Sequence, residues 1–211
     1  MPISLAARNV SHRFGKVVAL DGVSIDVLAG RAVALVGESG SGKTTLLRCF
    51  NSLVEPDQGE VIVGDRDVRT QPAVQLRRGI GYVQQHGGLL PHWRVLRNVA
   101  LVPVLQGMSD PIDAARPGVV LLDEPFGALD AISRGELHES FDALRRSLSL
   151  TTLLVTHDLA EAARLADDIV VMKKGRIEQM GTMRTLITAP ATEYVAHLIA
   201  RARAGLEALQ A

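Results

Sequence analysis

The strongest chemical signal in the sequence is residues 37–44, whose spacing fits G-x-x-x-x-G-K-[ST]. Glycines let a backbone turn tightly and approach a ligand that a Cβ atom would exclude. The N–H groups of such a loop, with the positive end of the following helix dipole, favour a bound polyphosphate. The pattern therefore predicts a nucleotide site. Its residues are Gly37, Glu38, Ser39, Gly40, Ser41, Gly42, Lys43, Thr44 and Thr45.

The segments on either side of this loop match the elements that it needs. Residues 31–36 are mostly apolar and β-branched, which predicts a short buried strand, and residues 44–51 read as the first turns of a helix. In this setting Lys43 would reach the β- and γ-phosphates, and the Thr44 hydroxyl would complete the shell of a Mg²⁺ ion.

Two carboxylates follow a second apolar run, residues 119–122. A central parallel strand has this pattern when its end meets a Mg²⁺-nucleotide. We expect Asp123 to hold the metal, through water, and Glu124 to polarise the attacking water as a general base. Alternatively, the two acidic residues cap the turn before the next helix. Their combination with a phosphate loop favours the functional interpretation.

Three further side chains stand where they could reach a nucleotide, but their spacing alone leaves each role open. Gln84 and Gln85 follow the apolar strand predicted over residues 79–83, and His157 follows the one predicted over residues 151–156. Strand ends of an α/β sheet point towards the ligand crevice, although glutamines also begin solvated loops and a lone histidine is usually structural. Phe14 precedes a glycine in a polar turn, so it is either a stacking face for adenine or a plug of the hairpin.

The rest of the chain predicts an α/β fold with two kinds of sheet. Residues 3–10 and 17–27 read as strands of an N-terminal β layer, and residues 65–78 as a polar, irregular segment. Residues 133–148, 158–166 and 192–209 read as helices, with a hairpin over 169–179.

Composition bounds the possible partners. The 211 residues suffice for one large or one-and-a-half ordinary domains, and the 23 basic and 23 acidic residues leave no net charge. This balance, with 3% aromatic residues, argues against a nucleic-acid partner. The single Cys49 is expected to be a buried, reduced thiol. We see no signal peptide and no apolar run of membrane-spanning length, which predicts a cytoplasmic protein.

Taken together, these motifs resemble one family over nearly the whole chain, the nucleotide-binding subunits of ABC transporters. Residues 37–44 resemble Walker A, residues 119–124 Walker B and residues 125–130 the D-loop with its lead-in, and residues 81–85 resemble the Q-loop strand. The resemblance implies a P-loop NTPase core with a parallel central sheet and an N-terminal antiparallel β layer. It also implies ATP and Mg²⁺ as cofactors.

The resemblance gives each candidate residue a role. It implies that Phe14 stacks on adenine, that Gln85 links the metal site to the membrane partner, and that His157 stabilises phosphate charge. The implied catalytic residues are Glu124, His157 and Gln85, and the implied metal ligands are Thr44, Gln85 and Asp123. The implied partners are membrane-spanning permease subunits and a second ATP-binding subunit, which would place the chain on the inner face of the plasma membrane.

The sequences of three loops most resemble those of importer ATPases for quaternary-amine osmoprotectants (glycine betaine, choline, carnitine). They are residues 88–92, 124–130 and 177–182. On this basis the chain is expected to be one ABC-type domain, residues 1–211, with a C-terminal helical segment over 182–211.

One departure from the family changes the expected activity. The family places a helical subdomain and an L-S-G-G-Q signature between the Q-loop and Walker B, whereas here only residues 86–118 join them, with an apparent seam at 107–114. The signature of one subunit closes over the γ-phosphate bound to the other. We therefore expect either a working importer ATPase or a truncated module that binds ATP and hydrolyses it slowly or not at all. A DNA-repair ATPase head would need a coiled-coil insertion or a basic face, which the sequence lacks.

Overall fold

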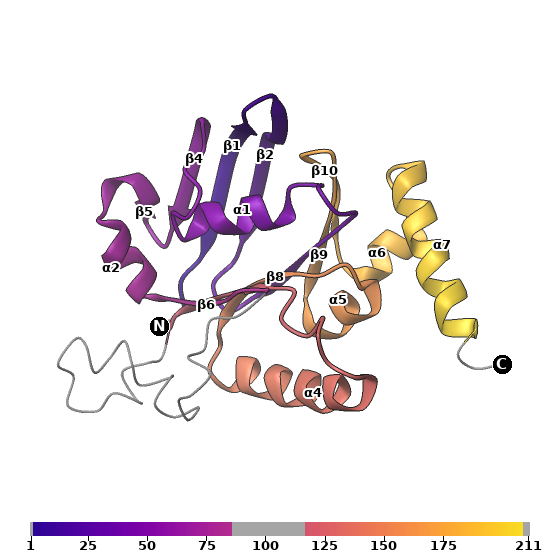
Figure 1. Cartoon of the computed structure of the whole chain (residues 1–211). Coiled ribbons are helices and arrows are strands. Elements are labelled where there is room, and N and C mark those ends of the chain that lie inside the picture. Colours follow the sequence, from indigo (N-terminus) through magenta and orange to yellow (C-terminus); the bar gives the residue numbers. More distant parts are fainter. Residues whose placement is uncertain (1, 86–116, 209–211) are drawn as a thin grey trace.

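The computed structural model describes residues 2–85 and 117–208. Within them the chain forms two sheets with helices on both sides of the larger one (Figure 1). The shortened subdomain region expected over residues 86–118 lies outside the described residues, apart from its last two positions, and so does the seam at 107–114.

The larger sheet is mostly parallel and has the strand order β10-β9-β3-β8-β7-β6. Strands β3 and β8 lie at its centre and are buried at every residue, because helices and strands cover both of their faces. The bounds are β3 (Ala32–Val36), β6 (Ile80–Val83), β7 (Val119–Asp123), β8 (Thr151–Val155), β9 (Asp168–Lys173) and β10 (Arg176–Gly181). Among the described strands of this sheet, only β10 runs antiparallel, as the second half of a hairpin with β9. The parallel arrangement brings the carboxyl ends of β3, β6, β7 and β8 to one edge.

The smaller sheet is antiparallel and confirms the predicted N-terminal β layer. Its order is β2-β1-β4-β5, with β1 (Leu5–Phe14), β2 (Val17–Val27), β4 (Gln58–Val63) and β5 (Arg66–Asp67). Helix α1 (Lys43–Phe50) lies between the two sheets, as Figure 1 shows. Its buried Leu46, Leu47 and Phe50 share one core with residues of both sheets. Cys49 is buried in this core as expected, and its burial raises the pKa of the thiol to about 12.

The opposite face of the larger sheet carries four helices and a second core. The helices are α4 (Ala131–Ser147), α5 (Leu159–Leu165), α6 (Met183–Thr188) and α7 (Glu193–Ala208). Buried residues from α5, α6 and α7 pack there against side chains of β3, β7, β8 and β9. Asp130 caps the N-terminus of α4, because its carboxylate accepts hydrogen bonds from the N–H groups of Ile132 and Ser133 at 3.1 and 3.0 Å. None of the described helices is long and apolar enough to cross a membrane.

The expectation that residues 65–78 are irregular is wrong. This segment holds β5, a 3₁₀ turn η1 (Val68–Thr70) and helix α2 (Ala73–Arg78). Val68 and Leu76 are its buried anchors in the first core. Their burial orders a segment whose polar composition suggested a loop, because tertiary packing outweighs weak local preferences.

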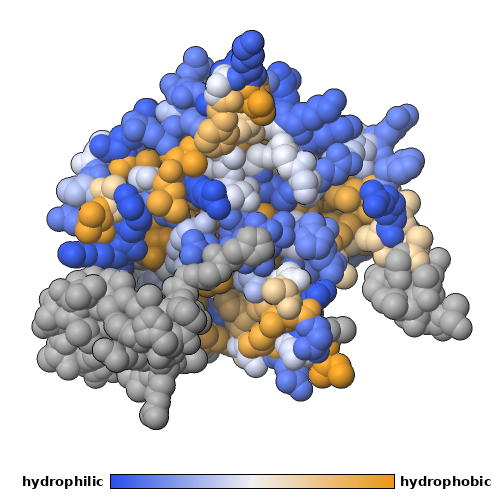
Figure 2. Space-filling view, in the orientation of Figure 1, coloured by the Kyte–Doolittle hydropathy of each residue, from blue (hydrophilic) through white to orange (hydrophobic). Residues whose placement is uncertain are grey.

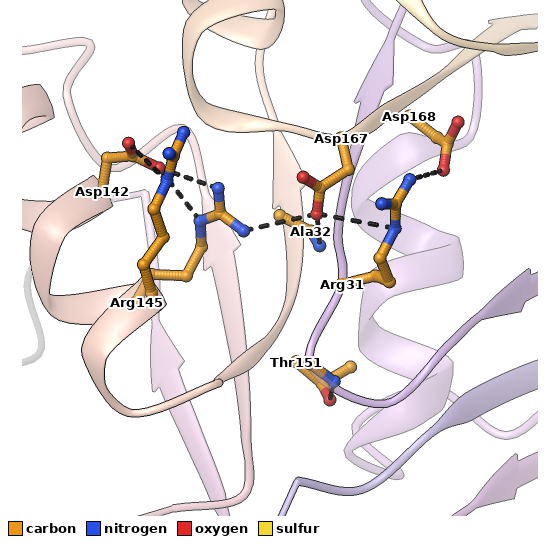
Figure 3. A network of polar contacts seen from close by, with 9 residues as sticks. Arg31, Ala32, Asp142, Arg145, Thr151, Asp167 and Asp168 are labelled. Atoms are coloured by element: carbon orange, nitrogen blue, oxygen red, sulfur yellow. Dashed lines mark hydrogen bonds and ion pairs between the residues drawn. The ribbon is translucent and has the colours of Figure 1, made fainter.

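A polar network ties the elements together at the amino ends of the parallel strands (Figure 3). The buried Arg145 of α4 donates to Asp142 at 2.8 Å and to Asp167 at 3.3 Å. The Asp167 carboxylate also accepts a 2.7 Å hydrogen bond from the N–H of Ala32, at the start of β3. Arg31 donates to Asp168 at 3.0 Å. The network therefore connects α4, the segment before β9 and the start of β3.

Candidate functional site

The phosphate loop between β3 and α1 is pressed against two other strands. A Cβ atom on Gly42 would stand 2.4 Å from the carbonyl oxygen of Ala19 in β2, and one on Gly37 would stand 2.2 Å from that of Met172 in β9. Both glycines also have positive φ angles, 102° and 148°. Any larger residue would push the loop away from these strands. The sequence pattern therefore reflects a close approach of backbones as well as a ligand.

The Lys43 side chain folds back onto the phosphate loop. Its ammonium group donates to the carbonyl oxygens of Gly37 and Glu38, both at 2.8 Å, and lies 3.4 Å from the Ser41 hydroxyl. Burial lowers the pKa of Lys43, although the carboxylates of Glu124 and Asp123 oppose this shift. A buried ammonium held by carbonyl oxygens is well suited to bind phosphate oxygens in the same place.

The hydroxyl of Thr44 meets the carboxylate of Asp123 at the carboxyl edge of the sheet. Thr44 Oγ1 donates to Asp123 Oδ1 at 2.8 Å, while the buried Oδ2 has no hydrogen-bond partner among the described residues and lies 3.6 Å from Arg48 Nη2. An orphaned buried carboxylate oxygen is costly. A hydroxyl and a carboxylate are also the protein oxygens that Mg²⁺ accepts beside substrate phosphates. These residues therefore fit the expected metal.

Three strand ends converge on one oxygen of Glu124. Gln85 Nε2 donates to Glu124 Oε2 at 2.9 Å, and Nδ1 of the exposed His157 lies 3.5 Å from the same oxygen. Glu124 itself has a φ of 47°, and its N–H donates to the carbonyl oxygen of Val155 at 3.0 Å. A left-handed backbone is uncommon for glutamate, and strained residues of this kind cluster at active sites. The structure thus brings together three residues that spacing alone could not connect.

Phe14 ends β1 at the tip of the antiparallel layer and is 54% exposed. Val17 and Val18 are exposed beside it, and Figure 2 shows apolar surface at this tip among hydrophilic residues. The edge of the His12 ring packs against Phe14, with 4.5 Å between the ring centroids and 85° between the ring planes. An exposed aromatic face is what stacking on a base requires.

Two residues at the site escaped the sequence reasoning. Arg48 is one helical turn beyond Thr44, so the four-residue spacing on α1 could have revealed it. Tyr194 of α7 accepts a 3.3 Å hydrogen bond from the N–H of Glu38, and Lys173 Nζ lies 4.3 Å from the Tyr194 ring centroid. Burial raises the pKa of Tyr194. No local pattern predicts a contact between residues so far apart in the sequence.

A pocket of about 440 Å³ opens between α7 and the phosphate loop. Its walls include Gly37, Glu38 and Ser39 of the loop, His157, and Leu198 and Arg201 of α7. The site therefore has open space beside the loop, on the side where His157 follows the end of β8.

Comparisons with known proteins bear on the family and the fold. The sequence profile of the ABC transporter family matches residues 20–157. A solved dimeric ATP-binding cassette, in a post-hydrolysis state bound to ADP and Pi, superimposes with a TM-score of 0.73. It covers 85% of this chain and 99% of that chain at 23% sequence identity. This likeness shows a shared fold.

The sequence relatives include import proteins for different solutes. The glycine betaine uptake system ATP-binding protein of Escherichia coli K12 is 37% identical over 95% of this chain and 78% of its own length. The glycine betaine/carnitine/choline transport ATP-binding protein of Bacillus subtilis is 36% identical over 88% of this chain and 59% of its own length. The sulfate/thiosulfate import ATP-binding protein of Synechocystis is 38% identical over 92% of this chain and 64% of its own length.

Proposed function

The chain belongs to the ATP-binding subunits of ABC transporters, a family of ATPases, and we propose that it is an importer subunit that binds Mg²⁺-ATP at the carboxyl edge of its parallel sheet. The observation that carries the proposal is the meeting of Thr44 and Asp123 at 2.8 Å, directly beside the Lys43 loop and Glu124. A loop for phosphate, a pair of oxygens for metal and a carboxylate for water stand together there.

In this proposal different residues contact the base, the phosphates and the metal ion. Phe14 stacks on adenine, and residues 37–45 surround the phosphates with backbone N–H groups and the Lys43 ammonium. Thr44, Asp123 and Gln85 would hold Mg²⁺. The metal, when bound, neutralises charge on the phosphate oxygens.

Glu124 is the proposed general base of hydrolysis. Its Oε2 accepts from Gln85 and lies near His157, so both side chains orient the carboxylate. Glu124 takes a proton from the water whose oxygen bonds to the γ-phosphorus, and the bond from that phosphorus to the bridging oxygen of ADP breaks. His157 and Lys43 stabilise the charge that develops on the γ-phosphoryl oxygens.

We further propose that this chain turns ATP over slowly, because half of a composite site is missing. The sequence contains no L-S-G-G-Q segment. The alignment with the Escherichia coli relative runs over 240 positions against 211 residues in the whole chain, so the chain lacks counterparts for at least the difference of 29. These facts support a shortened segment at residues 86–118 within a single domain, and helices α6 and α7 support a C-terminal helical segment over 182–211. Positioned donors from a partner subunit typically contribute about 100-fold or more to the rate of such reactions.

The second candidate function is an ATP-binding module without useful catalysis, which the same missing signature favours. Steady-state ATPase activity of the purified chain with Mg²⁺, beside direct ATP binding, separates the two. Glu124→Gln and Lys43→Ala serve as controls. ATP binding with turnover at the level of Glu124→Gln supports the binding module. Turnover well above both controls would contradict the proposed incomplete site.

We propose a quaternary-amine osmoprotectant as the transported solute and permease subunits on the inner face of the plasma membrane as partners, with a second ATP-binding subunit completing a dimer. The similarity to the glycine betaine relatives and the sequences of residues 124–130 and 177–182 support this choice. The sulfate/thiosulfate relative is the competing solute class. The test is a hybrid chain that carries the Escherichia coli relative's segment in place of residues 86–118. The hybrid chain should restore uptake of glycine betaine. Restored uptake of sulfate alone would overturn the choice of an osmoprotectant as the solute.

A further inference from the structure

The turn after α1 reaches back to the strand that carries Phe14. Asp57 Oδ2 accepts a 2.8 Å hydrogen bond from the N–H of Arg13, and the N–H of Asp57 donates to the carbonyl oxygen of Ser11 at 2.9 Å. Asp57 is therefore hydrogen-bonded to the backbone of β1 on both sides of His12. A carboxylate that accepts from a backbone N–H fixes that peptide more firmly than a neutral side chain would.

His12 lies between Asp57 and Phe14. Its Nδ1 is 3.4 Å from Asp57 Oδ1, and its ring meets Phe14 edge to face. The side chain is only 13% exposed, and among the described residues neither ring nitrogen has a hydrogen-bond partner. A buried imidazole with this geometry acts on Phe14 through ring packing.

His12 is also connected to the phosphate loop, through Leu20 of β2. His12 pairs with Leu20 across the β1–β2 ladder. Leu20 Cδ2 stands 3.0 Å from the position that a Cβ atom on Gly42 would take, so Leu20 packs directly on the loop. Helix α1 begins at Lys43, and the Asp57 turn follows its end. The Phe14 ring is thus connected to the phosphate loop through β2 and through α1.

We infer that Asp57 and His12 are positioning residues that hold the Phe14 ring at the distance from the phosphate loop that an adenine nucleoside triphosphate requires. They contribute to affinity for the base and leave the phosphate contacts unchanged. The inference rests on the proposed stacking of Phe14 on adenine. It assigns Asp57, which no pattern in the sequence connects with a nucleotide, to base recognition.

The experiment compares two ligands on the full chain, ATP and inorganic tripolyphosphate, each with Mg²⁺ and measured by calorimetry. Tripolyphosphate reports on the phosphate loop alone, and Lys43→Ala tests whether that loop is the site. The variants are Phe14→Ala, Asp57→Ala, Asp57→Asn, and the double variant Phe14→Ala with Asp57→Ala. Asp65→Ala is the matched control, because its side chain is 95% exposed in the turn at the opposite end of β4 from Asp57.

Asp57→Ala should weaken ATP binding about fivefold, the size of effect expected for one aligned aromatic contact, while the affinity for tripolyphosphate stays within about twofold. Asp57→Asn should retain most of the ATP affinity, because its amide oxygen can still accept from Arg13. In the Phe14→Ala background, Asp57→Ala should have no further effect.

Three results would overturn the inference: equal weakening of both ligands by Asp57→Ala, additive losses in the double variant, or unchanged ATP affinity in Phe14→Ala. Failure of the proposed site looks different, because Lys43→Ala would then leave both ligands bound as in the wild type.

Discussion

At the carboxyl edge of the parallel sheet, Asp123 keeps a buried oxygen without a hydrogen bond and Glu124 adopts a left-handed backbone. At the amino edge, Arg145 is also buried, yet its guanidinium group donates to two carboxylates and Asp167 in turn accepts from the Ala32 N–H (Figure 3). On the carboxyl side the strands therefore end in polar groups with incomplete hydrogen bonding, because Asp123 Oδ1 accepts from Thr44 whereas Oδ2 has no hydrogen-bond partner among the described residues. On the amino side a buried guanidinium group is bonded to two carboxylates.

The difference indicates what each edge contributes. Unpaired and strained groups raise the free energy of the folded chain and are kept where a ligand will use them. Paired groups between distant segments hold the fold together. Substitutions at the amino edge should therefore change stability without changing nucleotide binding, and substitutions at the carboxyl edge should do the reverse.

The largest effect on stability is expected for Arg145→Met. Removing the guanidinium group leaves the Asp142 and Asp167 carboxylates without their buried partner, which should lower the free energy of unfolding by about 3 kcal/mol. Urea unfolding measures this loss, and ATP affinity should stay within about twofold.

Arg146→Met is the matched control for that prediction. Arg146 pairs with the same Asp142 at 2.9 Å but is exposed, so its loss should cost less than about 1 kcal/mol. Equal costs for the two arginines would show that the amino-edge network does not stabilise the fold.

Asp123→Asn should show most clearly that the carboxyl edge serves ligand binding and not stability. Asparagine keeps an acceptor for the Thr44 hydroxyl and removes a buried charge, so the free energy of unfolding should not fall and could rise by about 1 kcal/mol. The gain in ATP affinity that Mg²⁺ brings should fall about 10-fold or more. A destabilised variant with an unchanged response to Mg²⁺ would contradict the account.

A smaller loss is expected for Thr151→Val at the amino edge. Thr151 Oγ1 accepts a 2.8 Å hydrogen bond from the N–H of Gly30, which valine leaves unsatisfied. Thermal or urea unfolding should show a loss of about 1 kcal/mol. Calorimetry should show ATP binding as in the wild type, and weaker binding would mean that the edges are coupled.

The smallest effect concerns pH. Burial pushes the pKa of Asp142 upward, but hydrogen bonds from Arg145 and Arg146 outweigh it and hold the pKa below its ordinary value. The stability that this depressed pKa provides is present above the ordinary value of about 3.9 and is lost as pH falls through the folded-state pKa. Unfolding of Asp142→Asn should therefore depend less on pH below about 4 than unfolding of the wild type. Parallel pH profiles would show that Asp142 does not contribute.

Much of this contrast could be anticipated from local patterns at the carboxyl edge. The strand, loop and helix around residues 31–51 and the acidic pair after residues 119–122 are contiguous in sequence, so type and spacing predicted their places. Gln85 and His157 needed the sheet order, because parallel neighbours bring strand ends together whatever their separation along the chain.

The amino edge could not be anticipated, because its contacts join residues far apart. Arg145 and Asp167 are separated by a strand and a helix, and each looks like an ordinary surface charge in sequence. The ordering of residues 65–78 was missed for a related reason. Its two buried side chains, Val68 and Leu76, are too few to give a periodic pattern, yet they suffice once a core receives them.

Equilibrium binding of Mg²⁺-ATP to the free chain, with Lys43→Ala beside it, tests the central claim most directly. The account predicts one ATP per chain and a loss of at least about 100-fold in the variant, since two charge-assisted hydrogen bonds are worth roughly 1.5–3 kcal/mol each. The variant should remain folded without ligand, although it loses the hydrogen bonds that Lys43 donates to Gly37 and Glu38. ATP affinity within tenfold of the wild type, or loss of binding only because the variant unfolds, would contradict the assignment of this edge to the nucleotide.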